Sequence, residues 1–114
     1  MVSRVGSSVS TVKIGDRVLY SSISGTFQSF TRADEDLVIP IPDNLGFEIA
    51  AGLPCVYTTA IYSLTDVAKL QAGETILIHA AAGGVGQAAI QIAKLAGANI
   101  FATVSSIEKR DVSS

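Results

Sequence analysis

The segment between residues 75 and 104 constrains the fold of this chain more than any other. It opens with Thr75 to His79, a mostly apolar run without alternation, which is typical of a parallel strand covered on both faces. Gly97 stands where a left-handed helix cap belongs, and Asn99 to Val104 is a second apolar run. The residues between them place one apolar stripe on a helix: Val85, Ala88, Ala89, Ile92 and Ala96. The spacing therefore predicts one βαβ unit, which needs roughly 30 residues.

A glycine-rich loop joins the first predicted strand to the helix. Its spacing matches the dinucleotide pattern G-x-G-x-x-G, with Ala81, Gly83 and Gly86 in the three glycine positions. The pattern needs small residues because backbone amides and the helix N-terminus must come close to a pyrophosphate. A glycine-rich turn that binds nothing is the competing interpretation. The residues of this loop predicted to bind a dinucleotide are Ala82, Gly83, Gly84, Val85 and Gly86.

The end of the second predicted strand indicates which dinucleotide the loop would hold. An NAD site places a carboxylate about 20 residues beyond the glycines, whereas this chain has Ser105 and Ser106, followed by Lys109 and Arg110. Hydroxyls can donate to a 2′-phosphate and the cations offset its charge, so the pattern favours NADPH. The alternative takes Glu108 as the acid and leaves the two cations on a solvated helix face.

The first 42 residues have the pattern of short strands and turns. The predicted strands are rich in β-branched residues and lie at Val2 to Val5, Lys13 to Tyr20, Gly25 to Phe30 and Asp36 to Ile41. Two helical segments follow, Phe47 to Ala51 and one near Pro54 whose stripe is Val56, Ala60, Leu64 and Val67. We therefore predict three parts: a β segment over residues 1–42, connecting helices over 43–70, and a nucleotide-binding part over 71–114.

Composition argues against several kinds of partner. The 8 basic and 10 acidic residues give a formal net charge of −2 without long runs of one sign, so we expect neither nucleic acid nor a membrane surface as a partner. Zinc needs three or four protein ligands, usually Cys and His, and the chain has only Cys55 and His79, so no metal is expected. A single cysteine forms no internal disulfide, which fits a cytoplasmic location.

The sequence resembles the medium-chain dehydrogenase/reductase superfamily, and within it the enoyl-reductase domains of polyketide synthases, especially fungal reducing ones. Four segments carry the resemblance in order along the chain: Lys13 to Val18, Ala50 to Ala60, His79 to Gly86 and Ser106 to Arg110. It implies an α/β fold in which part of a GroES-like β domain precedes the first βαβ unit of a Rossmann sheet, a doubly wound parallel sheet.

The resemblance also implies a function. Enoyl reductases of this kind use NADPH to reduce the C=C bond of an α,β-unsaturated acyl thioester, which we expect an acyl carrier protein to present. By this analogy Tyr57 and Thr58 line the nicotinamide and phosphate region, although ordinary helix packing explains them equally well. Lys109 is the candidate catalytic residue, binding phosphate or standing near the proton donor. A zinc-free quinone oxidoreductase and a truncated, noncatalytic nucleotide-binding product are the alternatives.

The family's domains extend beyond both ends of this sequence. The apolar fraction of 48% is high for so short a chain and indicates surface that other parts cover. We therefore expect an internal piece of a larger polypeptide, inactive when made alone and marginally folded or associated.

Overall fold

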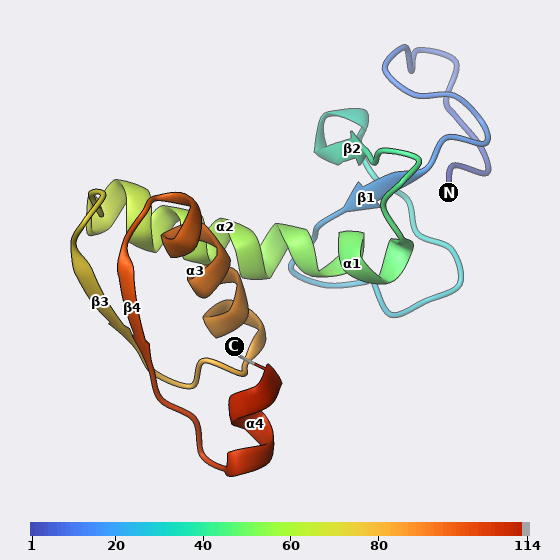
Figure 1. The fold of residues 1–114 in the computed structure, drawn as a ribbon. Coiled ribbons are helices and arrows are strands. Elements are labelled where there is room, and N and C mark those ends of the chain that lie inside the picture. The colour runs from blue at the N-terminus through green and yellow to red at the C-terminus, as the bar shows by residue number, and fades with distance from the viewer. Residues whose placement is uncertain (113–114) are drawn as a thin grey trace. The chain divides into compact units, whose positions relative to one another are not determined.

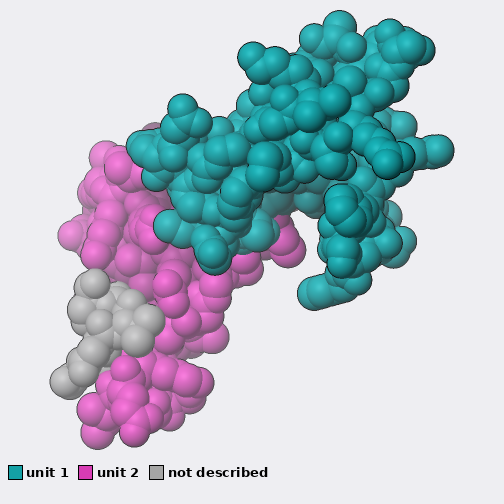
Figure 2. All heavy atoms as spheres, turned by 90° about the vertical axis from the view of Figure 1, so that its right-hand side faces the viewer, with its two compact units in different colours: residues 1–54 teal, residues 55–114 magenta. Residues whose placement is uncertain are grey.

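The computed structural model describes the backbone of residues 1–112 and the side chains of residues 1–109. Contacts divide the chain into two compact units, residues 1–54 and residues 55–114, which Figure 2 colours separately. The first unit contains β1 (Val18–Tyr20), the 3₁₀ turn η1 (Glu35–Leu37), β2 (Val38–Pro40) and α1 (Phe47–Gly52). The π-helical segment η2 (Leu53–Tyr57) crosses the boundary. The second unit contains α2 (Thr58–Ile61), the π-helical η3 (Tyr62–Val67), β3 (Thr75–Ile78), α3 (Gly84–Leu95), β4 (Asn99–Ala102) and α4 (Ile107–Val112) (Figure 1).

Two short strands are the only regular β-structure among the described residues of the first unit. β1 pairs with β2 in antiparallel fashion, with Leu19 opposite Ile39. The predictions of strands at Val2 to Val5 and Gly25 to Phe30 are wrong, and the two paired strands are shorter than predicted. A strand needs a neighbour and a packed face, but Phe27 is fully exposed, so its segment has no packed face.

Two polar side chains hold the loops of the first unit in place. The guanidinium of Arg17 donates to the carbonyl oxygens of Pro42, Asp43 and Leu45, at 3.0, 3.0 and 2.6 Å, and lies 4.6 Å from the centre of the Phe47 ring. One carboxylate oxygen of Glu35 accepts hydrogen bonds from the amides of residues 10 and 11, at 3.0 and 3.1 Å, and from the hydroxyl of residue 11, at 2.9 Å. These bonds lower the pKa of Glu35.

The helical path between the strands is less regular than predicted. Pro54 lies within η2, and a proline inside a helix removes one backbone donor and crowds the carbonyl four residues earlier. The wider π turns shift later residues out of the 3.6-residue period. Accordingly Ala60 and Leu64 are buried as predicted, but Val67 is 66% exposed and its place on the buried stripe was wrong.

The predicted βαβ unit is present in the second unit. β3 and β4 are parallel neighbours, with Thr75 opposite Asn99 and Ile78 opposite Ala102. Both strands end before the predicted His79 and Val104. Gly97 has φ +76°, so the predicted left-handed cap after α3 is confirmed.

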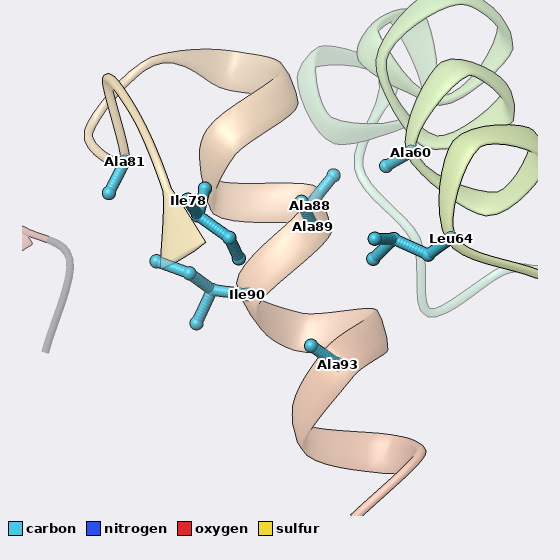
Figure 3. Close-up of a cluster of buried hydrophobic side chains, with 8 residues drawn as sticks. All are labelled: Ala60, Leu64, Ile78, Ala81, Ala88, Ala89, Ile90 and Ala93. Atoms are coloured by element: carbon cyan, nitrogen blue, oxygen red, sulfur yellow. The ribbon is translucent and has the colours of Figure 1, made fainter. Parts of the chain in front are cut away.

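The core of the second unit forms around α3. Figure 3 shows Ala60 and Leu64 pointing toward one side of α3, while Ile78 of β3 meets Ile90 on the other. Because two elements cover α3, its buried arc is wider than the predicted stripe and includes Ile90 and Ala93, at 6% and 0% exposure, whereas Val85 is 43% exposed.

Within the described part of the chain, α3 covers one face of the two-stranded sheet and the other face is open. Leu77 is 56% exposed and Phe101 is 65% exposed, and they are paired neighbours on β3 and β4. The run without alternation is typical of a strand covered on both faces, whereas the described residues cover a single face, through α3. The result is an apolar surface open to solvent.

Candidate dinucleotide-binding site

A pocket lies at the carboxyl ends of β3 and β4, where ligands bind in open parallel sheets. Its volume is about 420 Å³. The lining comes from the loop after β3, the segment after β4 and the first turns of α4: Ala80, Ala82, Gly83, Thr103, Val104, Ser105 and Lys109. The glycine loop and the segment predicted to select the cofactor thus meet in one pocket.

Hydrogen bonds tie the two strand ends together beneath this pocket. The amide of Thr103 donates to the carbonyl of Ile78 at 2.9 Å, and its own carbonyl accepts from the amide of Ala81 at 3.0 Å. The Thr103 hydroxyl and His79 Nδ1 share a further hydrogen bond of 2.9 Å. Parallel pairing therefore continues past the strands and fixes where the loop begins.

The glycine loop turns through one left-handed residue. Ala80 has φ +51°, a conformation that costs a non-glycine residue roughly 1–2 kcal/mol. The amide of Gly83 donates to the Ala80 carbonyl at 2.9 Å and closes the turn, and the side chain of Ala81 is fully buried beneath it. A tight turn directly after the strand brings the start of α3 back to the strand ends.

The three loop glycines meet different neighbours. A Cβ on Gly86 would lie 2.6 Å from the Ala80 carbonyl oxygen and 2.8 Å from the Ala81 Cα, closer than real Cβ atoms come. On Gly83 it would lie 3.2 Å from the same oxygen, and on Gly84 3.3 Å from a methyl group of Val56. Gly86 thus permits the close packing of helix against loop, and Gly83 keeps the pocket wall free of a side chain.

The N-terminus of α3 supplies donors and positive potential at the pocket edge. Gly83 is the N-cap residue and no side chain caps this end of the helix. The amides of the first turn have no acceptor within the helix, and the helix dipole adds partial positive charge there. This arrangement suits an anionic group such as a phosphate.

The segment after β4 adds a cation and hydroxyls to the same pocket. Lys109 donates from Nζ to the Ser105 hydroxyl at 3.1 Å, and both residues line the pocket. Ser106 is half-buried and is not among the lining residues. The backbone of Arg110 belongs to α4, but its side chain lies outside the described residues. Glu108, the alternative acid, is exposed and does not line the pocket.

Tyr57 and Thr58 lie apart from the lining of this pocket. The Tyr57 hydroxyl donates to Oε1 of Gln91 at 2.7 Å, and Gln91 is about two helical turns along α3 from Gly84. Thr58 is exposed at the start of α2. The bond to Gln91 shows Tyr57 connecting its helix to α3, which is the packing role that the sequence left open.

Sequence reasoning missed two groups that shape the loop. Thr103 makes the bonds that join the strand ends, and the Gln87 side chain donates from Nε2 to the Ala82 carbonyl at 2.9 Å. Gln87 directly follows the last glycine of the pattern, which places its side chain one turn from the loop. That position is the sequence signal from which a contact between Gln87 and the loop could have been predicted.

The described residues provide neither a metal centre nor a membrane-spanning helix. The described side chains, those of residues 1–109, include no group of three or more His, Cys, Asp and Glu placed to hold a metal ion. In that same part of the chain, no helix combines the length and apolar character needed to cross a membrane.

Comparison with known proteins reveals close relatives. No protein-family model matches the chain. A highly reducing polyketide synthase of Aspergillus terreus is 58% identical over 115 residues, covering 96% of this chain but 4% of the relative. A second, from Fusarium mangiferae, is 54% identical over 111 residues, covering 97% of this chain and 4% of its own length. The chain therefore spans only a small part of the curated relatives it matches.

Solved structures share its fold. The CurK enoyl reductase is 47% identical with a TM-score of 0.87, over 96% of this chain and 32% of that one. An Escherichia coli quinone oxidoreductase, solved with NADPH, is 38% identical with a TM-score of 0.88, over 97% and 34%. These similarities confirm the predicted fold class, part of a GroES-like β domain followed by the first βαβ unit of a Rossmann sheet. The chain belongs to the medium-chain dehydrogenase/reductase superfamily, with segments of highly reducing polyketide synthases and enoyl reductases among its relatives.

Proposed function

We propose that this chain forms the phosphate-binding part of an NADPH site in an enoyl reductase of a polyketide synthase. The observation that carries the proposal is the pocket at the ends of β3 and β4, which is lined by Gly83 of the glycine loop and by the hydrogen-bonded pair Lys109 and Ser105. A pyrophosphate and a 2′-phosphate are the two anionic parts of NADPH. The pocket offers backbone donors for one and a cation with hydroxyls for the other.

The residues present fit this cofactor. Gly83 leaves the wall open where a side chain would stand, and the first turn of α3 would hold the pyrophosphate through backbone amides. Ser105 and Lys109 would hold the 2′-phosphate, with Ser106 and Arg110 of the same segment as further predicted contacts. The methyl groups of Ala80, Ala82 and Val104 give the pocket an apolar part on which an adenosine could lie.

Bound NADPH supplies a hydride to an acceptor. We propose an α,β-unsaturated acyl thioester on an acyl carrier protein as that acceptor, because the sequence relatives are polyketide synthases and a structural relative is an enoyl reductase. In this chain the residues hold and orient the cofactor, and the rest of a larger polypeptide supplies other contacts. We place Lys109 at the phosphate end, since its ammonium already faces the Ser105 hydroxyl in the pocket.

Quinone reduction is the second candidate, favoured by the equally close fold of the Escherichia coli quinone oxidoreductase. A noncatalytic nucleotide-binding role is the third. The enzyme candidates are separated by following NADPH oxidation with a crotonyl thioester or a quinone, in a protein that contains this segment. Binding of NADPH without turnover of either acceptor would support the noncatalytic role.

The binding site itself is tested with Gly83→Val. The Cβ alone would come 3.2 Å from the Ala80 carbonyl oxygen, and the branched side chain would occupy the phosphate approach. We expect NADPH affinity to fall by about tenfold or more, measured by fluorescence titration. Gly52→Val is the matched control, because a Cβ there meets no atom within 4 Å and the residue lies in α1. Unchanged affinity in the Gly83 variant would show that the loop is not the binding site.

A further inference from the structure

We propose that Gln87 is a positioning residue for the phosphate-binding loop: its side-chain amide fixes the orientation of the peptide between Ala82 and Gly83 before any cofactor arrives. The inference rests on the proposed NADPH site and names a residue that shapes it without lining it. Gln87 is half-buried and is not among the residues lining the pocket.

Gln87 holds two successive carbonyl groups of the loop. Its backbone amide donates to the Gly83 carbonyl at 2.8 Å, which is the first hydrogen bond within α3. Its side-chain Nε2 donates to the Ala82 carbonyl at 2.9 Å. The Gly83 amide is also engaged, donating to the Ala80 carbonyl at 2.9 Å. Both polar groups of the Ala82–Gly83 peptide are therefore committed to partners within the protein.

The orientation of this peptide matters because the loop would receive an anion. A carbonyl oxygen turned toward a phosphate would repel it, whereas here the Ala82 oxygen is turned toward Gln87. Glycine accepts many backbone conformations, so a loop with Gly83 and Gly84 in sequence has little intrinsic preference for one orientation. A side-chain hydrogen bond from the helix supplies that preference and reduces the ordering cost of binding.

The role requires a side chain of this length that can donate. Glutamate would present a second acceptor to the Ala82 carbonyl, and methionine has a similar shape but no donor. Lysine reaches a comparable distance and donates. The series Gln, Met and Lys at residue 87 therefore separates the hydrogen bond from the packing of the side chain.

The test compares Gln87→Met with Gln71→Met in an enoyl reductase that contains this segment. Gln71 is the matched control, because its Nε2 also donates to a backbone carbonyl, that of Lys69 at 2.7 Å, and it lies before β3, away from the loop. Two ligands are titrated: NADPH, and adenosine 2′-monophosphate, which has the 2′-phosphate but no pyrophosphate. Hydrogen exchange of the Gly83 amide is measured without ligand.

We expect Gln87→Met to weaken NADPH binding about threefold to tenfold, since a neutral hydrogen bond is worth about that ratio. Adenosine 2′-monophosphate should bind the variant as it binds the unmodified protein, and exchange at Gly83 should accelerate. Gln71→Met should change none of these quantities. Gln87→Lys should restore slow exchange at Gly83, and this readout is independent of the effect of its charge on ligand affinity.

Failure of the proposed function and failure of the role of Gln87 give different results. If the unmodified protein that contains this segment binds no NADPH, the proposed function falls and this inference falls with it. If that protein binds NADPH and its Gln87→Met variant binds it equally well, only the role of Gln87 is overturned. Equal losses for both ligands would overturn it as well, because they indicate general destabilisation. An unprotected Gly83 amide in the unmodified, unliganded protein would overturn it without any variant.

Discussion

Replacing Gly86 by alanine would test how closely α3 approaches the loop after β3. The added methyl group would lie 2.6 Å from the carbonyl oxygen of Ala80, 2.8 Å from the Cα of Ala81 and 2.9 Å from the carbonyl oxygen of Ala81. All three neighbours are backbone atoms. They cannot rotate away, so either the helix or the strand end must shift.

The expected loss of stability is the difference between two effects. Alanine in place of glycine favours a helix by up to about 1 kcal/mol. Forcing a methyl group into a filled space costs about 1–3 kcal/mol, and the upper part of that range applies where backbone must move. We therefore expect Gly86→Ala to lower the free energy of unfolding of the second unit by about 1–2 kcal/mol.

Gly84→Ala is the control on the same helical turn. Its methyl group would meet the two side-chain methyl groups of Val56, at 3.3 and 3.7 Å, and a small side-chain movement relieves the closer contact. Its stability should stay within about 0.5 kcal/mol of the unmodified chain. Urea unfolding of both variants, followed by circular dichroism at low micromolar concentration, gives the comparison. If Gly86→Ala is as stable as Gly84→Ala, the helix does not lie this close to the strand end and the account of the third glycine is wrong.

Three further changes have distinct expected results. Lys109→Ala should weaken NADPH binding about tenfold and leave NADH binding unchanged, as titrated in parallel, because only NADPH carries the 2′-phosphate; equal losses would contradict the assignment. Because hydrogen bonds lower the pKa of Glu35, the stabilising effect of its carboxylate is complete above its ordinary pKa and is lost as the pH falls through the lowered value. The amides of residues 10 and 11 should therefore lose protection from hydrogen exchange in acid, and Glu35→Gln should remove that pH dependence. A pH profile of exchange that is the same in the variant would refute this account. The chain should self-associate as its concentration rises, because Leu77 and Phe101 form an open apolar face. The double variant Leu77→Thr with Phe101→Thr should associate less in sedimentation experiments. Association that is unaffected by both changes would rule that face out.

The parts of the fold that sequence predicted well depend on neighbours in the chain. The position of the glycine loop followed from a strand run, three small residues and a helical stripe within about 30 residues. Gly97 was recognisable because a left-handed cap needs only its own backbone conformation, and it has φ +76°. Such features are decided locally, so the sequence contains the information.

The features that sequence missed depend on contacts with distant residues or on one side chain's orientation. Segments at Val2 to Val5 and Gly25 to Phe30 have the composition of strands but form no regular ladder, although Val2 exchanges backbone hydrogen bonds with Gly15 and Asp16. The stripe through Val67 failed because π turns change the helical period, which a 3.6-residue pattern cannot register. The hydrogen bond of Tyr57 to Gln91 is also a contact that no local pattern indicates, and the cofactor role of Tyr57 stays a prediction.

In the proposed site, the two phosphate-binding tasks are divided between backbone and side chains. At the glycine loop the donors are backbone amides of α3, so a side-chain change can impair them only by filling Gly83 or Gly86 or by releasing the peptide that Gln87 holds. At the start of α4 the contact is a 3.1 Å bond between Lys109 and Ser105, both exposed. Removing one exposed side chain there alters charge without disturbing the core. Preference between NADPH and NADH is therefore expected to change at α4 through single substitutions, while affinity for the pyrophosphate, common to both, stays with the loop.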